Sequence, residues 1–238
     1  MHIANSVALV TGASRGLGRH FVTQLLERGA TKVYATARNP ESVDLPGAEV
    51  LTLDITDPVS VAAVAKAASD VTLLVNNAGI NTMNELVSGD LDAIEQEMNT
   101  AYYGPLRMIR AFAPILKAAG GGAIVNVLSA ASWVPSGHWG AYHAAKAAAW
   151  SLTNSVRLEL SSQNTLVTGV YMGPTDTGLT RGLSFPFELN DPADIVRAAL
   201  DGVEANQSEV IADPLSAQVK AQLALDPATI YTPAAPTA

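Results

Sequence analysis

Short runs of apolar residues alternate along the chain with longer segments in which apolar residues recur every three to four positions. The runs are rich in Val, Ile and Leu without strict alternation, which is typical of strands covered on both faces. They predict strands at residues 7–10, 32–36, 50–53, 71–75, 123–128, 166–170 and 209–212. Strands that alternate with helices along a whole chain indicate right-handed βαβ units and a parallel sheet.

Residues between the runs carry helix signals. The apolar residues from 17 to 26 form one stripe, and Gly29 follows at the position of a helix C-terminus. The pair Asp57-Pro58 predicts a helix start, because Asp caps free N–H groups and Pro fits the first turn. We therefore predict an α/β fold, a single-domain Rossmann-type doubly wound sheet of about seven parallel strands with helices on both faces, over residues 1–225. Residues 226–238 lack periodicity, so we expect an irregular tail there.

Composition removes several classes of protein. The 238 residues are 48% hydrophobic and 15% charged, which excludes intrinsic disorder. A formal net charge of −8 argues against a nucleic-acid or membrane-surface partner, since both need basic faces. The chain has no cysteine, and its four histidines are scattered, so no metal site is expected. No targeting signal or membrane-length apolar run is visible, so we expect a cytoplasmic protein.

A glycine-rich segment connects the first predicted strand to the first helix. Gly12, Gly16 and Gly18 are spaced G-x3-G-x-G. Glycines let a pyrophosphate approach the backbone closely, and a helix N-terminus offers free N–H groups to it. A glycine motif alone can be a simple turn, but this one has the required strand before it and helix after it. It predicts a nucleotide site.

The end of the second strand indicates which nucleotide binds. NAD-binding proteins usually carry an acidic residue there, about 20 residues beyond the loop, to bind the ribose 2′-hydroxyl. This chain has Arg38 instead, and Arg15 in the loop could approach the same point. Two surface arginines would also explain the pattern, but two guanidinium groups at one corner favour a 2′-phosphate. We predict NADP(H) rather than NAD(H).

Tyr142 and Lys146 lie four residues apart at the start of a predicted helix, so both side chains share one face. A nearby ammonium favours the phenolate and should lower the tyrosine pKa toward neutral pH. Ser129 follows the strand at 123–128, at the sheet edge where open α/β sheets bind ligands. A Tyr-x3-Lys pair alone is usually a surface pair; with the serine and the glycine loop it indicates catalysis.

The chain resembles the short-chain dehydrogenase/reductase family over residues 5–212. The motifs that carry the resemblance are Thr11-Gly12-Ala13-Ser14-Arg15-Gly16-Leu17-Gly18, Asn76-Asn77-Ala78-Gly79, Asn99, Ser129, and Tyr142 with Lys146. Two departures occur: the loop after the sixth strand reads Gly173-Pro174 where Pro-Gly is usual, and Leu128 stands where a second serine is usual.

The resemblance implies four catalytic residues. Tyr142 would protonate the substrate oxygen, and Ser129 would bind and orient the carbonyl. Lys146 would lower the tyrosine pKa and hold the nicotinamide ribose, while Asn99 would support a proton-relay water. Cofactor contacts are implied for Gly12, Ser14, Arg15, Gly16, Leu17, Gly18, Arg38, Asp54, Ile55, Asn77, Ala78, Gly79, Tyr142, Lys146, Gly173, Thr175 and Thr177.

The stretch between Ser129 and Tyr142 should wall the substrate site. It contains Trp133, His138 and Trp139. These residues could be structural filler, or they could line a pocket for bulky or aromatic carbonyl compounds; both interpretations stay open. Residues 178–190 predict a small lid, and the Ala-rich helix from 144 resembles the one that packs between subunits in family tetramers, so a homo-oligomer (tetramer or dimer) is expected.

The leading hypothesis is an NADP(H)-dependent oxidoreductase that reduces a ketone or aldehyde by hydride transfer, with Tyr142 as general acid and a small molecule as its partner. One alternative is a dinucleotide-binding sensor or scaffold without catalysis. Another is an epimerase or dehydratase built on the same tyrosine and lysine.

Overall fold

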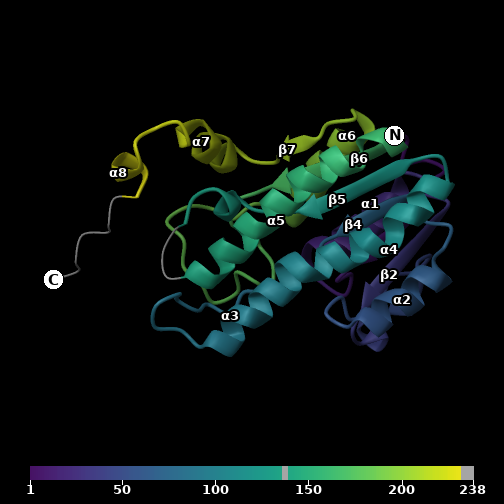
Figure 1. Cartoon of the computed structure of the whole chain (residues 1–238), viewed down its shortest axis with the longest axis horizontal. Helices are drawn as coiled ribbons and strands as arrows, with labels where there is room; N and C mark the ends of the chain where they lie inside the picture. The colour runs from purple at the N-terminus through teal and green to yellow at the C-terminus, as the bar shows by residue number, and fades with distance from the viewer. Residues whose placement is uncertain (136–138, 232–238) are drawn as a thin grey trace.

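The computed structural model describes residues 1–135 and 139–231, and within these ranges it has one sheet of seven parallel strands (Figure 1). The strands are β1 Val7–Thr11, β2 Lys32–Ala37, β3 Glu49–Thr52, β4 Leu73–Asn76, β5 Gly122–Val127, β6 Thr165–Tyr171 and β7 Glu209–Ile211. Their order is β3-β2-β1-β4-β5-β6-β7. This confirms the predicted doubly wound parallel sheet of the Rossmann type.

The predicted strand ends are correct to within two residues, and β4 shows the largest shift. The strand predicted at 71–75 begins later, because the Val71 N–H closes a turn onto the Ala68 carbonyl at 3.3 Å. It also ends later, at Asn76, whose Nδ2 donates to Asn126 Oδ1 at 2.8 Å inside the sheet. A polar pair buried between two strands cannot be seen in a pattern of hydrophobic residues.

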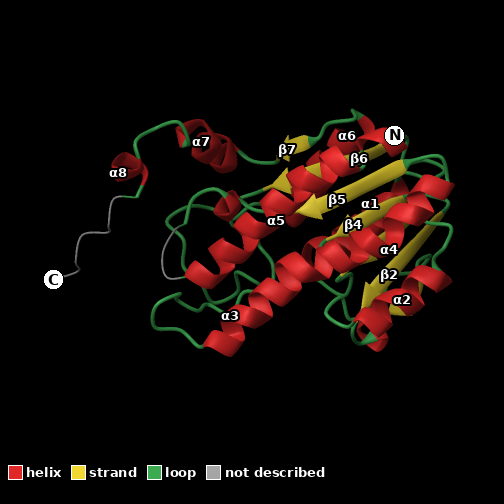
Figure 2. Cartoon of the chain, viewed as in Figure 1, coloured by secondary structure: helices red, strands yellow, loops and turns green. Residues whose placement is uncertain are grey.

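Helices cover both faces of the sheet (Figure 2). They are α1 Gly16–Glu27, α2 Pro58–Ala67, α3 Leu91–Met98, α4 Gly104–Ala118, α5 Gly140–Glu159, α6 Pro192–Glu204, α7 Pro214–Gln222 and α8 Pro227–Ile230. The side chains of β1 show the layering, since Val10 packs toward α1 and α6 while its neighbour Leu9 packs toward α2, α4 and α5. None of the described helices is long and apolar enough to cross a bilayer.

Four helices begin with the Asp-Pro signal that the sequence shows at Asp57. The side chains of Asp57, Asp191 and Asp226 accept a hydrogen bond from the second residue after them, and Asp213 accepts one from the third. The segment from 226 was predicted to be irregular, but Asp226 caps the short helix α8 there. The rest of that segment, 232–238, lies outside the described residues.

The strand order reverses between β1 and β4, which lie side by side at the centre of the sheet. The chain leaves β1 and β4 in opposite directions along the sheet, so the loops after their carboxyl ends diverge and leave a crevice. The glycine loop, the Asn77-Ala78-Gly79 segment and Ser129 all follow strands at this edge. The topology therefore brings together motifs that are up to 117 positions apart in the sequence (129 − 12).

Candidate active site

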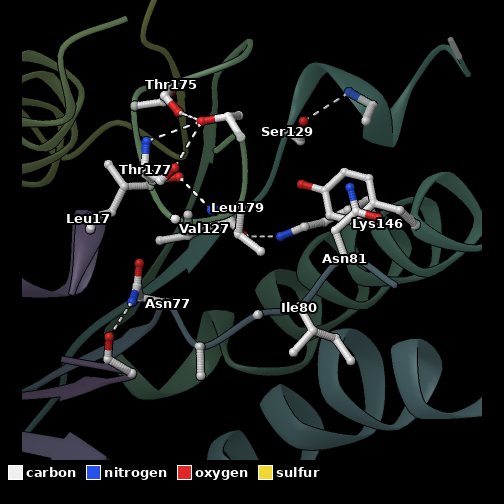
Figure 3. Close-up of a pocket in the computed structure, with 18 of the residues that line it drawn as sticks. Leu17, Asn77, Ile80, Asn81, Val127, Ser129, Lys146, Thr175, Thr177 and Leu179 are labelled. Atoms are coloured by element: carbon white, nitrogen blue, oxygen red, sulfur yellow. Dashed lines mark hydrogen bonds between the residues drawn. The ribbon is translucent and has the colours of Figure 1, made fainter. Parts of the chain in front are cut away.

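A cavity of about 710 Å³ opens at the carboxyl ends of the strands (Figure 3). Most of the residues predicted from the sequence line it: Gly12, Ser14, Arg15, Gly16, Leu17, Arg38, Asp54, Ile55, Asn77, Ala78, Gly79, Asn99, Ser129, Trp139, Tyr142, Lys146, Gly173, Thr175 and Thr177. The cavity extends from the glycine loop to the first turns of α5.

Gly18 was predicted to contact the cofactor but lies beneath the loop instead. It is buried in the first turn of α1, and a Cβ there would overlap the Gly12 carbonyl oxygen. The same oxygen accepts a hydrogen bond from Asn77 Nδ2 at 3.2 Å. The third glycine of the motif is thus needed so that the helix can pack against the loop.

Trp133 was predicted to touch the substrate, but it does not line the cavity. The Trp133 ring stacks on the Tyr171 ring, with centroids 4.2 Å apart. The ammonium of Lys220, on α7, lies 5.7 Å from the centroid of the Trp133 ring. The filler interpretation therefore applies to Trp133, whereas Trp139 lines the cavity. His138 lies outside the described residues.

The glycine loop fits a pyrophosphate. Gly12 and Gly16 have φ of +68° and +54°, and a Cβ on Gly12 would lie 2.9 Å from the Ala78 Cα. Helix α1 begins without a side-chain cap on its N-terminus and without an acidic residue in its first turn. Its free N–H groups and positive dipole end are therefore available to an anion in the cavity.

The corner beyond the ends of β2 and β3 carries Arg38 and Asp54, while Arg15 lines the cavity from the glycine loop with its guanidinium beside Gly178. Asp54 Oδ1 accepts hydrogen bonds from the Thr56 hydroxyl at 2.6 Å and from the Thr56 N–H at 2.8 Å. The hydroxyl contact, with the charge of Arg38 as a smaller cause, lowers the pKa of Asp54. Because Thr56 already binds the ionised Asp54 carboxylate, the guanidinium groups of Arg15 and Arg38 can face a ligand.

Ser129, Tyr142 and Lys146 converge on the cavity. Ser129 follows β5, and its Oγ accepts from the Ala131 N–H at 3.1 Å, donates to the Met172 carbonyl at 3.3 Å and interacts with the Tyr142 hydroxyl. Lys146 Nζ donates to the Val127 carbonyl at 3.0 Å and lies 5.7 Å from the centroid of the Tyr142 ring. Figure 3 shows Ser129 and Lys146 on one side of the cavity, facing the loop that carries Thr175 and Thr177.

Burial decides the protonation states of Tyr142 and Lys146. Desolvation raises the pKa of Tyr142 to about 12, and the Ser129 hydrogen bond acts in the opposite direction with a smaller effect. Desolvation likewise lowers the pKa of Lys146 to about 8. The expected lowering of the Tyr142 pKa by Lys146 is thus not found in this state. Tyr142 is protonated at neutral pH, as a proton donor must be.

Asn99 is placed at the edge of the cavity, and its role in a proton relay stays a prediction. It begins a π-helical turn, Asn99–Tyr103, of the kind that often occurs at functional sites. Its Oδ1 accepts a hydrogen bond from Arg107 Nη1 at 2.9 Å. The Asn99 side chain is therefore turned toward α4.

The sequence interpretation named residues 178–190 as a lid but did not single out the side chains that form the far wall of the cavity. The residues concerned are apolar and come from the segment before α5, the segment after β6, and helix α7: Val134, Leu179, Leu183, Phe185, Phe187, Leu215 and Val219. One signal was available, since Leu215 and Val219 are spaced i, i+4 after an Asp-Pro helix start.

Comparisons with known proteins agree with this geometry. The family model described as short chain dehydrogenase matches residues 6–185. A structure of a short chain dehydrogenase from Burkholderia cenocepacia in complex with NADP is 39% identical, with a TM-score of 0.92 over 98% of this chain and 100% of that one.

Two curated relatives are less similar. The 3-oxoacyl-(acyl-carrier-protein) reductase of Vibrio cholerae is 33% identical over 77% of this chain and 79% of its own length. The NADPH-dependent 1-acyldihydroxyacetone phosphate reductase of Schizosaccharomyces pombe is 34% identical over 73% of this chain. The match spans only 61% of the length of the Schizosaccharomyces protein.

Proposed function

The chain belongs to the short-chain dehydrogenase family, and from that premise we propose that it reduces a ketone or aldehyde to an alcohol with NADPH, Tyr142 being the general acid. Membership makes it an NAD(P)-dependent oxidoreductase. The observation that carries the finer proposal is the convergence of Ser129, Tyr142 and Lys146 on one cavity, with Tyr142 protonated at neutral pH because desolvation raises its pKa to about 12.

The three converging side chains have complementary roles in a reduction. Ser129 lies beside Tyr142, so one carbonyl oxygen can accept hydrogen bonds from both hydroxyl groups. When bound, the dinucleotide supplies the hydride. As negative charge develops on the substrate oxygen, Tyr142 gives it the phenolic proton, and the Lys146 ammonium stabilises the phenolate that remains.

A preference for the phosphorylated dinucleotide is supported by charge. Arg38 lies at the corner beyond β2 and β3, Arg15 lines the cavity from the glycine loop, and the only acidic residue in the described lining, Asp54, is already held by Thr56. Guanidinium groups bind phosphate through charge-assisted hydrogen bonds. The 2′-phosphate of NADPH would occupy this corner.

The substitution Tyr142→Phe tests the proposal. It removes the proton donor and keeps the ring, so kcat should fall by roughly 10² to 10⁴ while the Kd for NADPH is unchanged. Tyr171→Phe is the matched control, because Tyr171 is a buried tyrosine that lies outside the cavity lining and has a hydroxyl with no hydrogen-bond partner among the described residues. A fully active Tyr142→Phe enzyme would refute the mechanism. NADPH binding without oxidation by any carbonyl compound would support a sensor instead.

A further inference from the structure

The end of the cavity beyond Ser129 and Tyr142 has a wall of apolar side chains. Trp139 forms one side, and the segment after β6 places Leu183, Phe185 and Phe187 across from it. The rings of Trp139 and Phe185 meet edge to face at 6.3 Å, and those of Phe185 and Phe187 lie 5.8 Å apart. Rings in this arrangement present both faces and edges to a bound aromatic group.

Helix α7 completes this wall and is fixed to the rest of the site. Leu215 and Val219 face the cavity from α7. Asp213, which caps α7, accepts a hydrogen bond from the Gly173 N–H at 2.7 Å and two more from Ser216. The same buried carboxylate thus holds the helix and the loop after β6, so the apolar wall is formed before substrate binds.

None of the charged side chains in the described lining belongs to this apolar wall. Among the described lining residues the Lys, Arg, Asp and Glu side chains are Arg15, Arg38, Asp54 and Lys146. Arg38 and Asp54 lie at the corner beyond β2 and β3, Arg15 comes from the glycine loop with its guanidinium beside Gly178, and Lys146 is held by the Val127 carbonyl. A carboxylate or phosphate in the apolar end would lose its hydration without gaining an ion pair, which is strongly unfavourable.

We infer that the substrate is an uncharged ketone or aldehyde with a bulky apolar group, preferably an aromatic ring, attached to the carbonyl carbon. This inference rests on the proposed reduction and narrows its substrate. Phe187 is 44% exposed and Leu179 is 40% exposed at the cavity, so the bound ring would remove apolar surface from water.

A pair of matched ketones tests the inference. Methyl 4-acetylbenzoate and 4-acetylbenzoate share an aryl ketone; at the ring position opposite the ketone the first carries a neutral methyl ester and the second a carboxylate. With NADPH, we expect kcat/KM to be about 10- to 100-fold higher for the ester, because burying the unpaired carboxylate is unfavourable. A ratio of one or less would overturn the inference and leave the proposed function intact. Failure to reduce any ketone, acetone included, would instead count against the proposed function.

A variant adds a second arm to this test. Phe187→Arg places a cation at the partly exposed rim of the apolar end and should lower the ester-to-acid ratio several-fold. Val87→Arg is the matched control, since Val87 is fully exposed (101%) and lies outside the cavity lining. An unchanged ratio in the folded Phe187→Arg enzyme would contradict the placement of the substrate.

A separate observation concerns Glu97 on α3, a carboxylate with no exposed surface. Its Oε1 accepts hydrogen bonds from the Thr82 N–H at 2.5 Å and the Thr82 hydroxyl at 2.6 Å, while Oε2 has no partner among the described residues. The Thr82 carbonyl accepts from Asn84 Nδ2 at 3.0 Å, and the Asn84 carbonyl accepts from the Ala141 N–H at 3.1 Å. Ala141 directly precedes Tyr142.

The geometry points to Glu97 as a positioning residue for Tyr142, acting through the segment 82–84 that holds the first turn of α5. The charge of Glu97 also acts on α5. It raises the pKa of Tyr142 in the same direction as burial does, and it raises the pKa of His143 and Lys146, which burial lowers. The cation on α4 near this region, Arg107, is held by Asn99. Glu97 thus combines a mechanical and an electrostatic link to the catalytic tyrosine.

Two substitutions separate these links. Glu97→Gln keeps an acceptor for Thr82 and removes the charge, so kcat/KM should fall. In a plot of kcat/KM against pH, the decline on the alkaline side (the alkaline limb) should move to lower pH by roughly 0.5 to 1 unit. Thr82→Val weakens the tether and keeps the charge, so kcat/KM should fall with the limb unmoved. A Glu97→Gln enzyme that is folded by its Tm and has a wild-type kcat/KM, or a wild-type limb, would overturn the proposal.

Discussion

The two ends of the cavity are built in different ways. The end that fits the dinucleotide is made mainly of backbone, namely the glycine loop and the uncapped N-terminus of α1. The ends of β1 and β4 are joined there, because Thr11 Oγ1 accepts hydrogen bonds from the N–H groups of Asn77 and Ala78. The end that would hold the substrate is made of side chains from α7 and the segment after β6.

This difference decides which substitutions can change substrate specificity without changing the fold. A substitution in the backbone-made end alters the sheet and the loop together, so it should affect every substrate equally. A substitution in the side-chain-made end changes only the shape and polarity of a wall. Fold and cofactor are therefore fixed by one part of the molecule, and specificity can change in the other.

The largest expected effect is at Gly18. In Gly18→Ala the new Cβ would overlap the Gly12 carbonyl oxygen, so the glycine loop must move away from the helix. We expect NADPH affinity to fall by more than about 100-fold, with a lower Tm, whichever ketone is used. Gly182→Ala is the control in the other end: nothing lies within 4 Å of its Cβ, and its φ of +82° adds only about 1 kcal/mol of strain. Equal losses in both variants would remove the contrast between the two ends.

Next in size is Arg38→Asp. Replacing a guanidinium by a carboxylate should lower the ratio of kcat/KM for NADPH to that for NADH by roughly 10- to 100-fold, since one charge-assisted contact is lost and a repulsion is added. Arg19→Asp makes the same charge change at an exposed residue outside the cavity. If the two variants shift the ratio equally, Arg38 does not contact the phosphate.

A third prediction concerns pH. Lys146 must be charged to stabilise the Tyr142 phenolate, and burial lowers the pKa of Lys146 to about 8. Reductive kcat/KM should therefore be flat around neutrality and fall as the pH rises through about 8, well before Tyr142 itself ionises near 12. Lys146→Arg should abolish that limb, because arginine stays protonated. A limb that stays near pH 8 in this variant would assign it to another group.

The smallest effects compare two tryptophans. Trp139→Ala should raise the KM for a bulky aryl ketone several-fold while the Kd for NADPH stays constant, because Trp139 lines only the substrate end. Trp133→Ala should lower the Tm and leave KM unchanged, because that ring packs on Tyr171. A raised KM in Trp133→Ala alone would reverse the assignment of the two rings.

The sequence was most informative where function depends on local backbone geometry. The glycine loop, the helix start at Asp57 and the four-residue spacing of Tyr142 and Lys146 are local features, and the structure confirms the elements that carry them. The direction of the tryptophan at 133 is not local, since it depends on which surface the ring meets after folding.

The electrostatics of the site could not be predicted for the same reason. Spacing alone favours a lowered pKa for Tyr142 beside Lys146. The degree of burial, which only the folded chain has, reverses the direction. In the sequence Glu97 is one of four acidic residues, with Asp90, Asp92 and Glu95, that favour a solvated helix face, whereas in the folded chain Glu97 has no exposed surface.

The missing cap on α1 has a thermodynamic consequence. Five other described helices carry an aspartate at their N-terminus, whereas the first turn of α1 has its N–H groups free for a ligand. A ligand that binds only the folded chain at 100 times its Kd adds about 2.7 kcal/mol to the free energy of unfolding. Amide hydrogens in the first turn of α1 should therefore exchange slowly with solvent only when the dinucleotide is present, so that the cofactor completes a helix as well as a reaction.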